Sequence, residues 1–312
     1  MKNQSSKLVL KRIVCLILAV MLMVAFVPST QASAATKKGW VTSKGYKYYY
    51  LKTGKKATGV TKIGKYTYYF STEKKTVTVN GKKKTVAQKG SLLKGWYKIK
   101  SDYYYFDRST GKMAKSKTVD GIEIKSNGKA KKTTYNKKKI ALMIRSREMV
   151  EKITNVKDSK DAKRLKCFNY IKDTNNVPYI PYHFLKNVRS DKSWDIIMAN
   201  DILDDTAHIS AVTGKNQPGG ECTAMASAFA YLALECGYKT VYIVDDDKTL
   251  KGDNHTWVEI GGKVFDPLFA RNSVHGGMDN NYNAAYRYDG NLAHWAINKK
   301  NVSTGAVSTV TY

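Results

Sequence analysis

The sequence Gly219-Gly220-Glu221-Cys222-Thr223-Ala224-Met225-Ala226 joins two glycines to a cysteine and an alanine-rich run. The run continues to Glu235, and Gly237 follows as a C-terminal stop, so the pattern predicts a helix over 222–235. Its small side chains allow the helix to lie close against a sheet. Cys222 stands in the first turn, where unpaired backbone N–H groups and the helix dipole favour a thiolate. The stretch therefore predicts a packed helix that begins with a nucleophile.

A strand and a hairpin are predicted directly after this helix. The β-branched and aromatic run 240–244 is typical of a buried strand. After a polar loop over 245–254, residues 255–260 and 263–266 flank two glycines as the arms of a hairpin. The mixture of helices with a hairpin-containing sheet indicates an α+β fold.

The register of this hairpin brings two polar residues together. With a two-residue turn, Ile260 pairs with Lys263. His255 then lies on the same face as Asp266, as its diagonal neighbour, about 7 to 8 Å away between Cα atoms. That separation is within reach of the two side chains, so the register predicts a hydrogen bond between His255 and Asp266.

Helical periodicity precedes the Gly-Gly-Glu-Cys stretch. Apolar residues at three- and four-residue spacing predict helices over 143–153, 161–171 and 194–209. Two prolines make 176–182 a loop between helices. The acidic residues of these segments, Asp195 among them, are expected on solvated faces.

Basic residues are concentrated before Lys139. Residues 36–139 hold 29 basic and 5 acidic side chains, whereas 140–312 hold 21 and 20. We therefore place a domain boundary at 139/140 and expect 35–139 to attract polyanions through a long-range, salt-sensitive field. The basic residues of this segment are lysines apart from Arg108, so they supply point charge rather than forked hydrogen bonds.

The basic segment is also repetitive. Short aromatic runs alternate with glycine and lysine, which predicts a stack of β-hairpins, solenoid-like, with a terminal repeat over 121–130. Most of the aromatic side chains are expected to fill thin hairpins. The repeated elements are Gly39-Trp40 with Tyr48-Tyr49-Tyr50, Gly64 with Tyr68-Tyr69-Phe70, and Gly95-Trp96 with Tyr103-Tyr104-Tyr105-Phe106.

These elements resemble the cell-wall-binding repeats of Gram-positive surface proteins, relatives of choline-binding repeats, over about 36–132. The resemblance implies a bacterial cell wall as partner, either its peptidoglycan or an anionic wall polymer. Tyrosine stands where a second tryptophan of an aromatic cage is expected, so we expect no choline site. A lysine-rich segment with interleaved aromatic residues also suits nucleic acid, but export argues against it, and no nucleic-acid partner is expected.

The first residues predict export. Four basic residues precede an apolar run over 13–27, and Ala32-Ser33-Ala34 provides a cleavage site, so 1–34 reads as a signal peptide. An uncleaved membrane anchor is the alternative, but the run is shorter than the roughly 20 apolar residues that a spanning helix needs. We expect a secreted protein with no membrane span after cleavage, noncovalently associated with the cell wall.

Three cysteines follow the signal peptide, an odd number that forms no disulfide framework. Cys222 and Cys236 are expected at opposite ends of one helix, too far apart for a disulfide. Cys167 and Cys236 are either two buried thiols or a bridge.

Three motifs together resemble a known enzyme superfamily. Gly-x-Cys before an alanine-rich helix, then His255-Thr256-Trp257-Val258, then Asp266-Pro267, are similar to the transglutaminase-like superfamily of papain-type cysteine enzymes. The resemblance covers about 140–290, with its specific part in 219–268. It implies that Cys222 is the nucleophile, His255 the general base and acid, and Asp266 the carboxylate that fixes the imidazole tautomer.

The same resemblance offers Gln217 as an oxyanion donor beside the backbone N–H of Cys222, although Gln217 also suits a loop cap. It implies acyl transfer through a thioester on peptide or isopeptide bonds of a protein or peptide substrate, with no cofactor. Water as second nucleophile gives hydrolysis, and an amine gives a cross-link; hydrolysis is slightly favoured. An NlpC-type endopeptidase and a catalytically silent adhesin or scaffold are the alternatives.

No metal site is predicted. Asp245-Asp246-Asp247 lacks the alternating spacing and glycine of a calcium-binding loop, so it is expected to be solvated. No partners are predicted for the remaining histidines, which are His183, His208, His275 and His294.

Overall fold

A computed structural model describes residues 37–210, 214–246, 255–271, 281–284, 287–289, 292–294 and 298–309. The predicted signal peptide over 1–34, His275, and Asp247 of the acidic run lie outside these residues. Residues Gly39–Tyr312 belong to one compact unit. Among the residues described, no helix has both the length and the apolar composition needed to cross a membrane.

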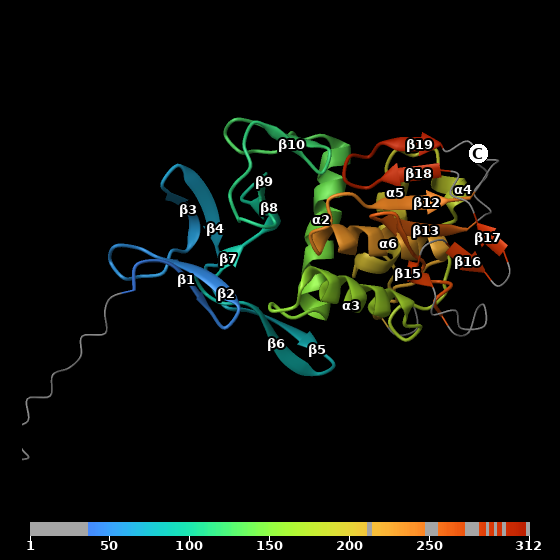
Figure 1. The fold of residues 1–312 in the computed structure, drawn as a ribbon, viewed down its shortest axis with the longest axis horizontal. Coiled ribbons are helices and arrows are strands. Elements are labelled where there is room, and N and C mark those ends of the chain that lie inside the picture. Colours follow the sequence, from blue (N-terminus) through green and yellow to red (C-terminus); the bar gives the residue numbers. More distant parts are fainter. Residues whose placement is uncertain are drawn as a thin grey trace, which may run out of the picture. The chain divides into compact units, whose positions relative to one another are not determined.

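Antiparallel hairpins form the basic segment, as predicted (Figure 1). Their turns include Asn80-Gly81 and Asp120-Gly121, where both central residues have positive φ, the backbone of a tight two-residue hairpin turn. A short strand, β7 (Leu92–Leu93), pairs with the second hairpin through β4. The hairpins are β1 (Gly39–Ser43) with β2 (Tyr46–Tyr50), β3 (Gly59–Ile63) with β4 (Tyr66–Phe70), β5 (Lys75–Val79) with β6 (Lys82–Ala87), β8 (Gly95–Ile99) with β9 (Asp102–Phe106), and β10 (Lys117–Val119) with β11 (Ile122–Ile124).

The repeated aromatic residues mostly fill the hairpins, as expected. Trp96 and Phe106 are fully buried, and the Trp96 indole donates a hydrogen bond to Asp120 over 2.8 Å. Trp40, in the first Gly-Trp element, is 37% exposed and packs edge-on against Tyr68. The two tryptophans of the same motif therefore differ in burial, because only Trp96 lies against the rest of the molecule.

Helix α2 (Thr134–Ile153) connects the hairpins to the second part of the chain. It begins at Thr134 because the Thr133 hydroxyl caps it by accepting the Asn136 N–H. The predicted boundary at 139/140 falls inside this helix, where Lys139 is 1% exposed and donates to the Ser303 carbonyl. The lysine-rich sequence therefore extends past the point where the hairpins give way to helices.

Two predictions about the helices that follow need correction. Helix α3 (Lys160–Lys172) matches its prediction, but α5 (Trp194–Leu203) ends before residue 209. It ends there because Asp204 turns extended and its carboxylate accepts the Thr206 N–H. A four-residue helix, α4 (Leu185–Val188), precedes α5 and was not predicted.

Asp195 is the second correction. It is 1% exposed rather than solvated, and it accepts hydrogen bonds from the Tyr231 hydroxyl over 2.7 Å and the Lys300 ammonium over 2.6 Å. A lysine over a hundred positions later in the chain therefore neutralises it.

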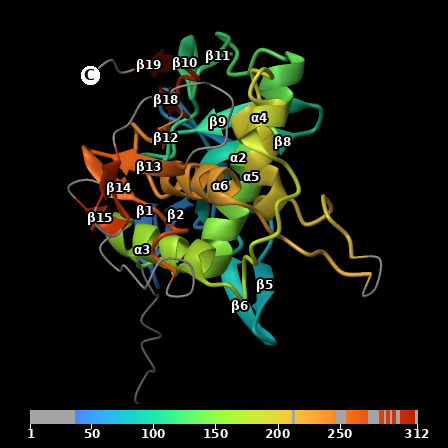
Figure 2. The ribbon, with the colours of Figure 1, turned by 90° about the vertical axis from the view of Figure 1, so that its right-hand side faces the viewer.

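Helix α6 (Cys222–Glu235) is the predicted alanine-rich helix, and Gly237 ends it with φ +105°. Every side chain from Thr223 to Leu234 is at most 1% exposed. Figure 2 shows α6 between the strands that follow it and the helices α2 and α5. The expected close packing against a sheet is confirmed.

The sheet is antiparallel and has the strand order β15-β14-β13-β12-β18-β19. Ile260 pairs with Lys263, so the predicted hairpin register is confirmed. A separate hairpin joins β16 (Arg287–Asp289) to β17 (Leu292–His294). The sheet strands are β12 (Tyr242–Asp245), β13 (Thr256–Ile260), β14 (Lys263–Phe265), β15 (Tyr282–Ala284), β18 (Asn298–Asn301) and β19 (Val307–Thr309).

The three cysteines of the described residues are buried thiols. Cys222 and Cys236 lie at opposite ends of α6, as predicted. The sulfur atoms of Cys167 and Cys236 are 3.9 Å apart, so the structure has two adjacent thiols rather than a bridge.

Trp96→Ala should lower the free energy of unfolding by about 3 to 5 kcal/mol, because it empties a fully buried site and removes a hydrogen bond. Trp40→Ala, at the equivalent motif position, should cost less than about 2 kcal/mol, since that side chain is partly exposed. Denaturant unfolding of both variants measures the difference. Equal losses would contradict the distinct burial of the two residues.

Candidate functional site

The predicted hydrogen bond between His255 and Asp266 is present. The His255 Nε2 atom lies 2.6 Å from Oδ2 of Asp266, whose side chain is fully buried at the end of β14. The other carboxylate oxygen accepts the backbone N–H of Phe269, and the Phe269 ring stacks on the imidazole at 4.0 Å between centroids. Carboxylate and ring are thus both fixed, and together they orient the imidazole.

Cys222 lies next to the first residues of β13. The backbone N–H of Thr256 donates to the thiol sulfur, an interaction that favours the thiolate. The hydroxyls of Thr223 and Thr256 are 2.9 Å apart, which joins the residue after Cys222 to the residue after His255. The structure therefore places Cys222 beside Thr256, the residue after His255, and His255 in contact with Asp266.

The expected acidic thiol is wrong for this arrangement. Burial, and then the nearby Glu221 carboxylate, raise the pKa of the Cys222 thiol well above its ordinary value. The thiol donates to Glu221 over 2.9 Å, while the same carboxylate caps α6 through the Thr223 N–H. The Glu221 carboxylate thus caps the N-terminus of α6 and lies beside the thiol, where its negative charge disfavours the thiolate.

The two glycines before Glu221 are required by close packing. A Cβ on Gly220 would stand 2.3 Å from the Cβ of Ala224, and one on Gly219 would stand 2.9 Å from the Cβ of Ile180. The chain therefore enters α6 in tight contact both with the helix itself and with the loop over 176–182. This tight entry fixes where Cys222 begins the helix.

Gln217 is exposed, on the segment that leads to these glycines. Its backbone N–H donates to the His208 carbonyl and its carbonyl accepts the Tyr182 hydroxyl, each over 2.8 Å. Its side chain has no hydrogen-bond partner in the described parts of the chain. These contacts fit the loop role, and its part as an oxyanion donor stays a prediction.

Two histidines that were expected to lack partners share one carboxylate. Nδ1 of His183 lies 2.8 Å from Oδ1 of Asp201, and Nε2 of His208 lies 2.9 Å from the same oxygen. The sequence does hold one histidine before α5 and one after it, with Asp201 in the last turn of that helix. Only folding brings the three side chains together. The side chain of His294 is not among those described.

The expectation for the acidic run at 245–247 also needs correction. Asp245 is 4% exposed rather than solvated, and Arg189 donates to it over 2.9 Å. Asn298 of the neighbouring strand donates to its other oxygen over 2.8 Å. Asp245 is therefore a paired residue of the sheet.

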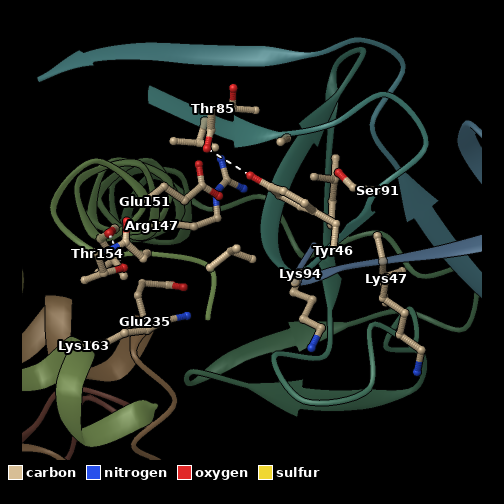
Figure 3. Close-up of a pocket in the computed structure, with 18 of the residues that line it drawn as sticks. Tyr46, Lys47, Thr85, Ser91, Lys94, Arg147, Glu151, Thr154, Lys163 and Glu235 are labelled. Atoms are coloured by element: carbon tan, nitrogen blue, oxygen red, sulfur yellow. Dashed lines mark hydrogen bonds and ion pairs between the residues drawn. The ribbon is translucent and has the colours of Figure 1, made fainter. Parts of the chain in front are cut away.

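A cavity of about 300 Å³ lies where the hairpins meet α2 and α3 (Figure 3). Tyr46 of β2 projects across it and donates to the Thr85 carbonyl over 3.0 Å. Three lysines from separate segments also line it, namely Lys47, Lys94 and Lys163. The cavity is thus built from the hairpins and the helices together.

These three lysines make no ion pair with the described residues, whereas the other charged groups of the cavity are paired. Arg108 binds Glu235 over 2.7 Å, and Lys84 donates to the last carbonyls of α2. Burial, and then the charges of Lys47 and Lys163, lower the pKa of Lys94. The uncompensated positive charge makes this cavity a candidate anion-binding site.

Glu221→Gln should lower the pKa of the Cys222 thiol, because it removes the negative charge beside it while keeping an oxygen that can cap α6. Alkylation of Cys222 by iodoacetamide, followed by mass spectrometry across a pH series, should then reach its midpoint at lower pH. The matched control is Glu123→Gln, at the exposed position of β11, which should leave the profile unchanged. An unchanged midpoint in Glu221→Gln would contradict the assigned cause.

No model of a known protein family matches the chain, and no curated protein sequence matches it. Among solved structures, the choline binding domain of Spr1274 in Streptococcus pneumoniae is similar to 31% of this chain and 99% of its own, with 23% identity and a TM-score of 0.24.

Two further structures from Streptococcus pneumoniae are similar to part of the chain. The choline-binding domain of CbpL matches 31% of this chain and 43% of its own, with 23% identity and a TM-score of 0.21. The modular autolysin LytC matches 30% and 28%, with 16% identity and a TM-score of 0.14. The chain spans less than half of the length of these two proteins. The resemblance of 140–290 to transglutaminase-like enzymes stays a prediction.

Proposed function

We propose that this protein is exported and binds an anionic polymer of the bacterial cell wall through its hairpins and the cavity that they share with α2 and α3. The observation that carries the proposal is the convergence of Lys47, Lys94 and Lys163 on that cavity without carboxylate partners. A phosphodiester or carboxylate of a wall polymer would supply the missing negative charge.

The shape and lining of the cavity suit a sugar-phosphate unit of such a polymer. Its volume of about 300 Å³ is at the small end of ligand sites in proteins. Tyr46 offers an aromatic face for a sugar ring, and lysine ammonium groups bind phosphate as point charges. The dense lysines of the surrounding hairpins would raise the local concentration of an extended polyanion and make binding salt-sensitive.

Charge reversal tests this binding. The triple variant Lys47→Glu, Lys94→Glu and Lys163→Glu should weaken binding to purified cell wall by about tenfold or more at moderate salt. The matched control reverses Lys62, Lys117 and Lys125, which are exposed elsewhere on the hairpins. Co-sedimentation across a salt series measures both. If both triple variants weaken binding equally, overall charge explains the binding, and the cavity is not the binding site.

A second candidate function is acyl transfer by Cys222. It is favoured by the 2.6 Å contact between His255 and Asp266 at the place where the Thr256 N–H meets the thiol. Because Nε2 faces Asp266, Nδ1 is the nitrogen left to exchange a proton with the thiol. The imidazole, held by carboxylate and ring, matches the role of a general base with an orienting group.

The steps follow from these roles. His255 takes the thiol proton, the sulfur attacks a peptide or isopeptide carbonyl, and the backbone N–H of Cys222 faces the developing oxyanion. His255 then gives the proton to the leaving amine, which leaves a thioester on Cys222. Attack by water or a second amine, with its proton passing to His255 and on to the sulfur, restores the thiol.

One observation favours the silent alternative. In the described arrangement the thiol donates to Glu221, and its pKa is raised, so the acidic neighbour opposes nucleophile formation. For acyl transfer the proton must pass to His255 instead of resting against Glu221. A protein in which this transfer does not occur would bind the wall without reacting.

Incubation of purified wall and a labelled primary amine with wild-type protein and with Cys222→Ala separates these functions. Mass spectrometry should find released fragments for hydrolysis, or incorporated amine for transamidation, in the wild type and neither in Cys222→Ala. His255→Ala should be as inactive as Cys222→Ala. Wall binding with no product in any sample would leave the silent binder as the function.

A further inference from the structure

We propose that His183, Asp201 and His208 bind a divalent transition-metal cation, with zinc as the first candidate. The three ligand atoms lie within 4.8 Å of one another. They come from three segments of the chain: the loop after α3, the last turn of α5, and the segment that follows α5. The site is separate from the cysteine and from the lysine cavity, and it does not depend on either proposed activity.

The distances are close to those of a coordinated ion. His183 Nδ1 and His208 Nε2 each lie within 2.9 Å of Oδ1 of Asp201. Zinc holds nitrogen and oxygen ligands at about 2.0 to 2.2 Å, so tetrahedral neighbours stand about 3.3 Å apart. Each imidazole nitrogen would therefore need to move only a few tenths of an ångström away from Oδ1 of Asp201 to reach the spacing of zinc ligands.

The ligands are already oriented. Asp201 is 2% exposed, and its backbone carbonyl accepts the Gly219 N–H over 3.1 Å. The His208 ring stacks on Tyr182 with centroids 3.5 Å apart and planes 5° from parallel. Fixed ligands lose little entropy on binding an ion, which favours affinity.

Access and ligand chemistry select the kind of ion. The His183 side chain is 40% exposed and that of His208 is 17% exposed, so an ion can enter from solvent. Two imidazoles and one carboxylate suit zinc, cobalt, nickel or copper, whereas calcium and magnesium prefer oxygen ligands alone. Three protein ligands leave further coordination positions for water or another small ligand.

The metal-free alternative is a carboxylate that accepts N–H bonds from two neutral imidazoles. The same distances would hold together the loop after α3 and the segment that leads through Gln217 to α6. This alternative predicts no ion at micromolar metal, so metal binding distinguishes the two directly.

The test uses the mature full-length chain, stripped with a chelator and titrated with Zn²⁺ and with Co²⁺. One equivalent of either ion should bind, and Zn²⁺ should raise the melting temperature. His183→Ala and His208→Ala should each weaken binding by at least about tenfold, and the double variant should abolish it. Cys222→Ala is the control: it removes the thiol beside Glu221 at the start of α6 and should bind the ion as wild type does.

A further variant tests residue 208 as a metal ligand through a new spectroscopic signal rather than through lost metal binding. His208→Cys keeps a metal-binding group at the position and should give the intense near-ultraviolet sulfur-to-cobalt charge-transfer band that wild type lacks. Melting temperatures of the stripped variants show that each one folds. Absence of a bound ion in wild type, undiminished binding in the folded double variant, or loss of binding in Cys222→Ala would each overturn the proposal.

Discussion

The burial of α6 on every side is the constraint on which the rest of the structure depends. Its side chains from Thr223 to Leu234 are at most 1% exposed, and alanines let the helices and the sheet approach its backbone closely. The chain enters the helix through a tight turn, since a Cβ on Gly220 would stand 2.3 Å from the Cβ of Ala224. Cys222 is therefore fixed at the start of β13, where the His255–Asp266 pair stands.

Buried ion pairs link distant segments around this helix. Arg108 of the basic segment binds both Asp120 and Glu235 at the end of α6, and Lys300 of the sheet binds Asp195 of α5. Removing one partner of such a pair leaves an uncompensated buried charge and typically costs about 3 to 5 kcal/mol. Because Arg108 ties the hairpins to α6, the basic segment and the helical part fold as one unit, and the lysine cavity forms at their junction.

Local patterns predicted the α6 boundaries, the hairpin register and the His255–Asp266 contact, because each depends on neighbours within a few residues or across one tight turn. Patterns failed where distant residues decide the outcome. Charge density placed the boundary at 139/140, but the Thr133 cap starts α2 at Thr134, so the last lysines of the basic segment belong to this helix. Asp195 and Asp245 are charged and were expected at the surface, but both are buried, because Lys300 and Arg189, far away in the sequence, neutralise them.

The sequence by itself determined that Cys222 begins a helix and that His255 reaches Asp266 across a hairpin, since these follow from the order of helix and hairpin and from a period of two along the strands. Only the tertiary structure decided the burial of the Cys222 thiol and its contact with the Glu221 carboxylate. Burial and Glu221 raise the pKa of the Cys222 thiol, against the effect of the helix dipole. It also decided the grouping of His183, Asp201 and His208, and of the three cavity lysines. The residues of each cluster come from different elements and do not recur at helical or strand spacing along the sequence, so only the packing of the folded chain brings them together.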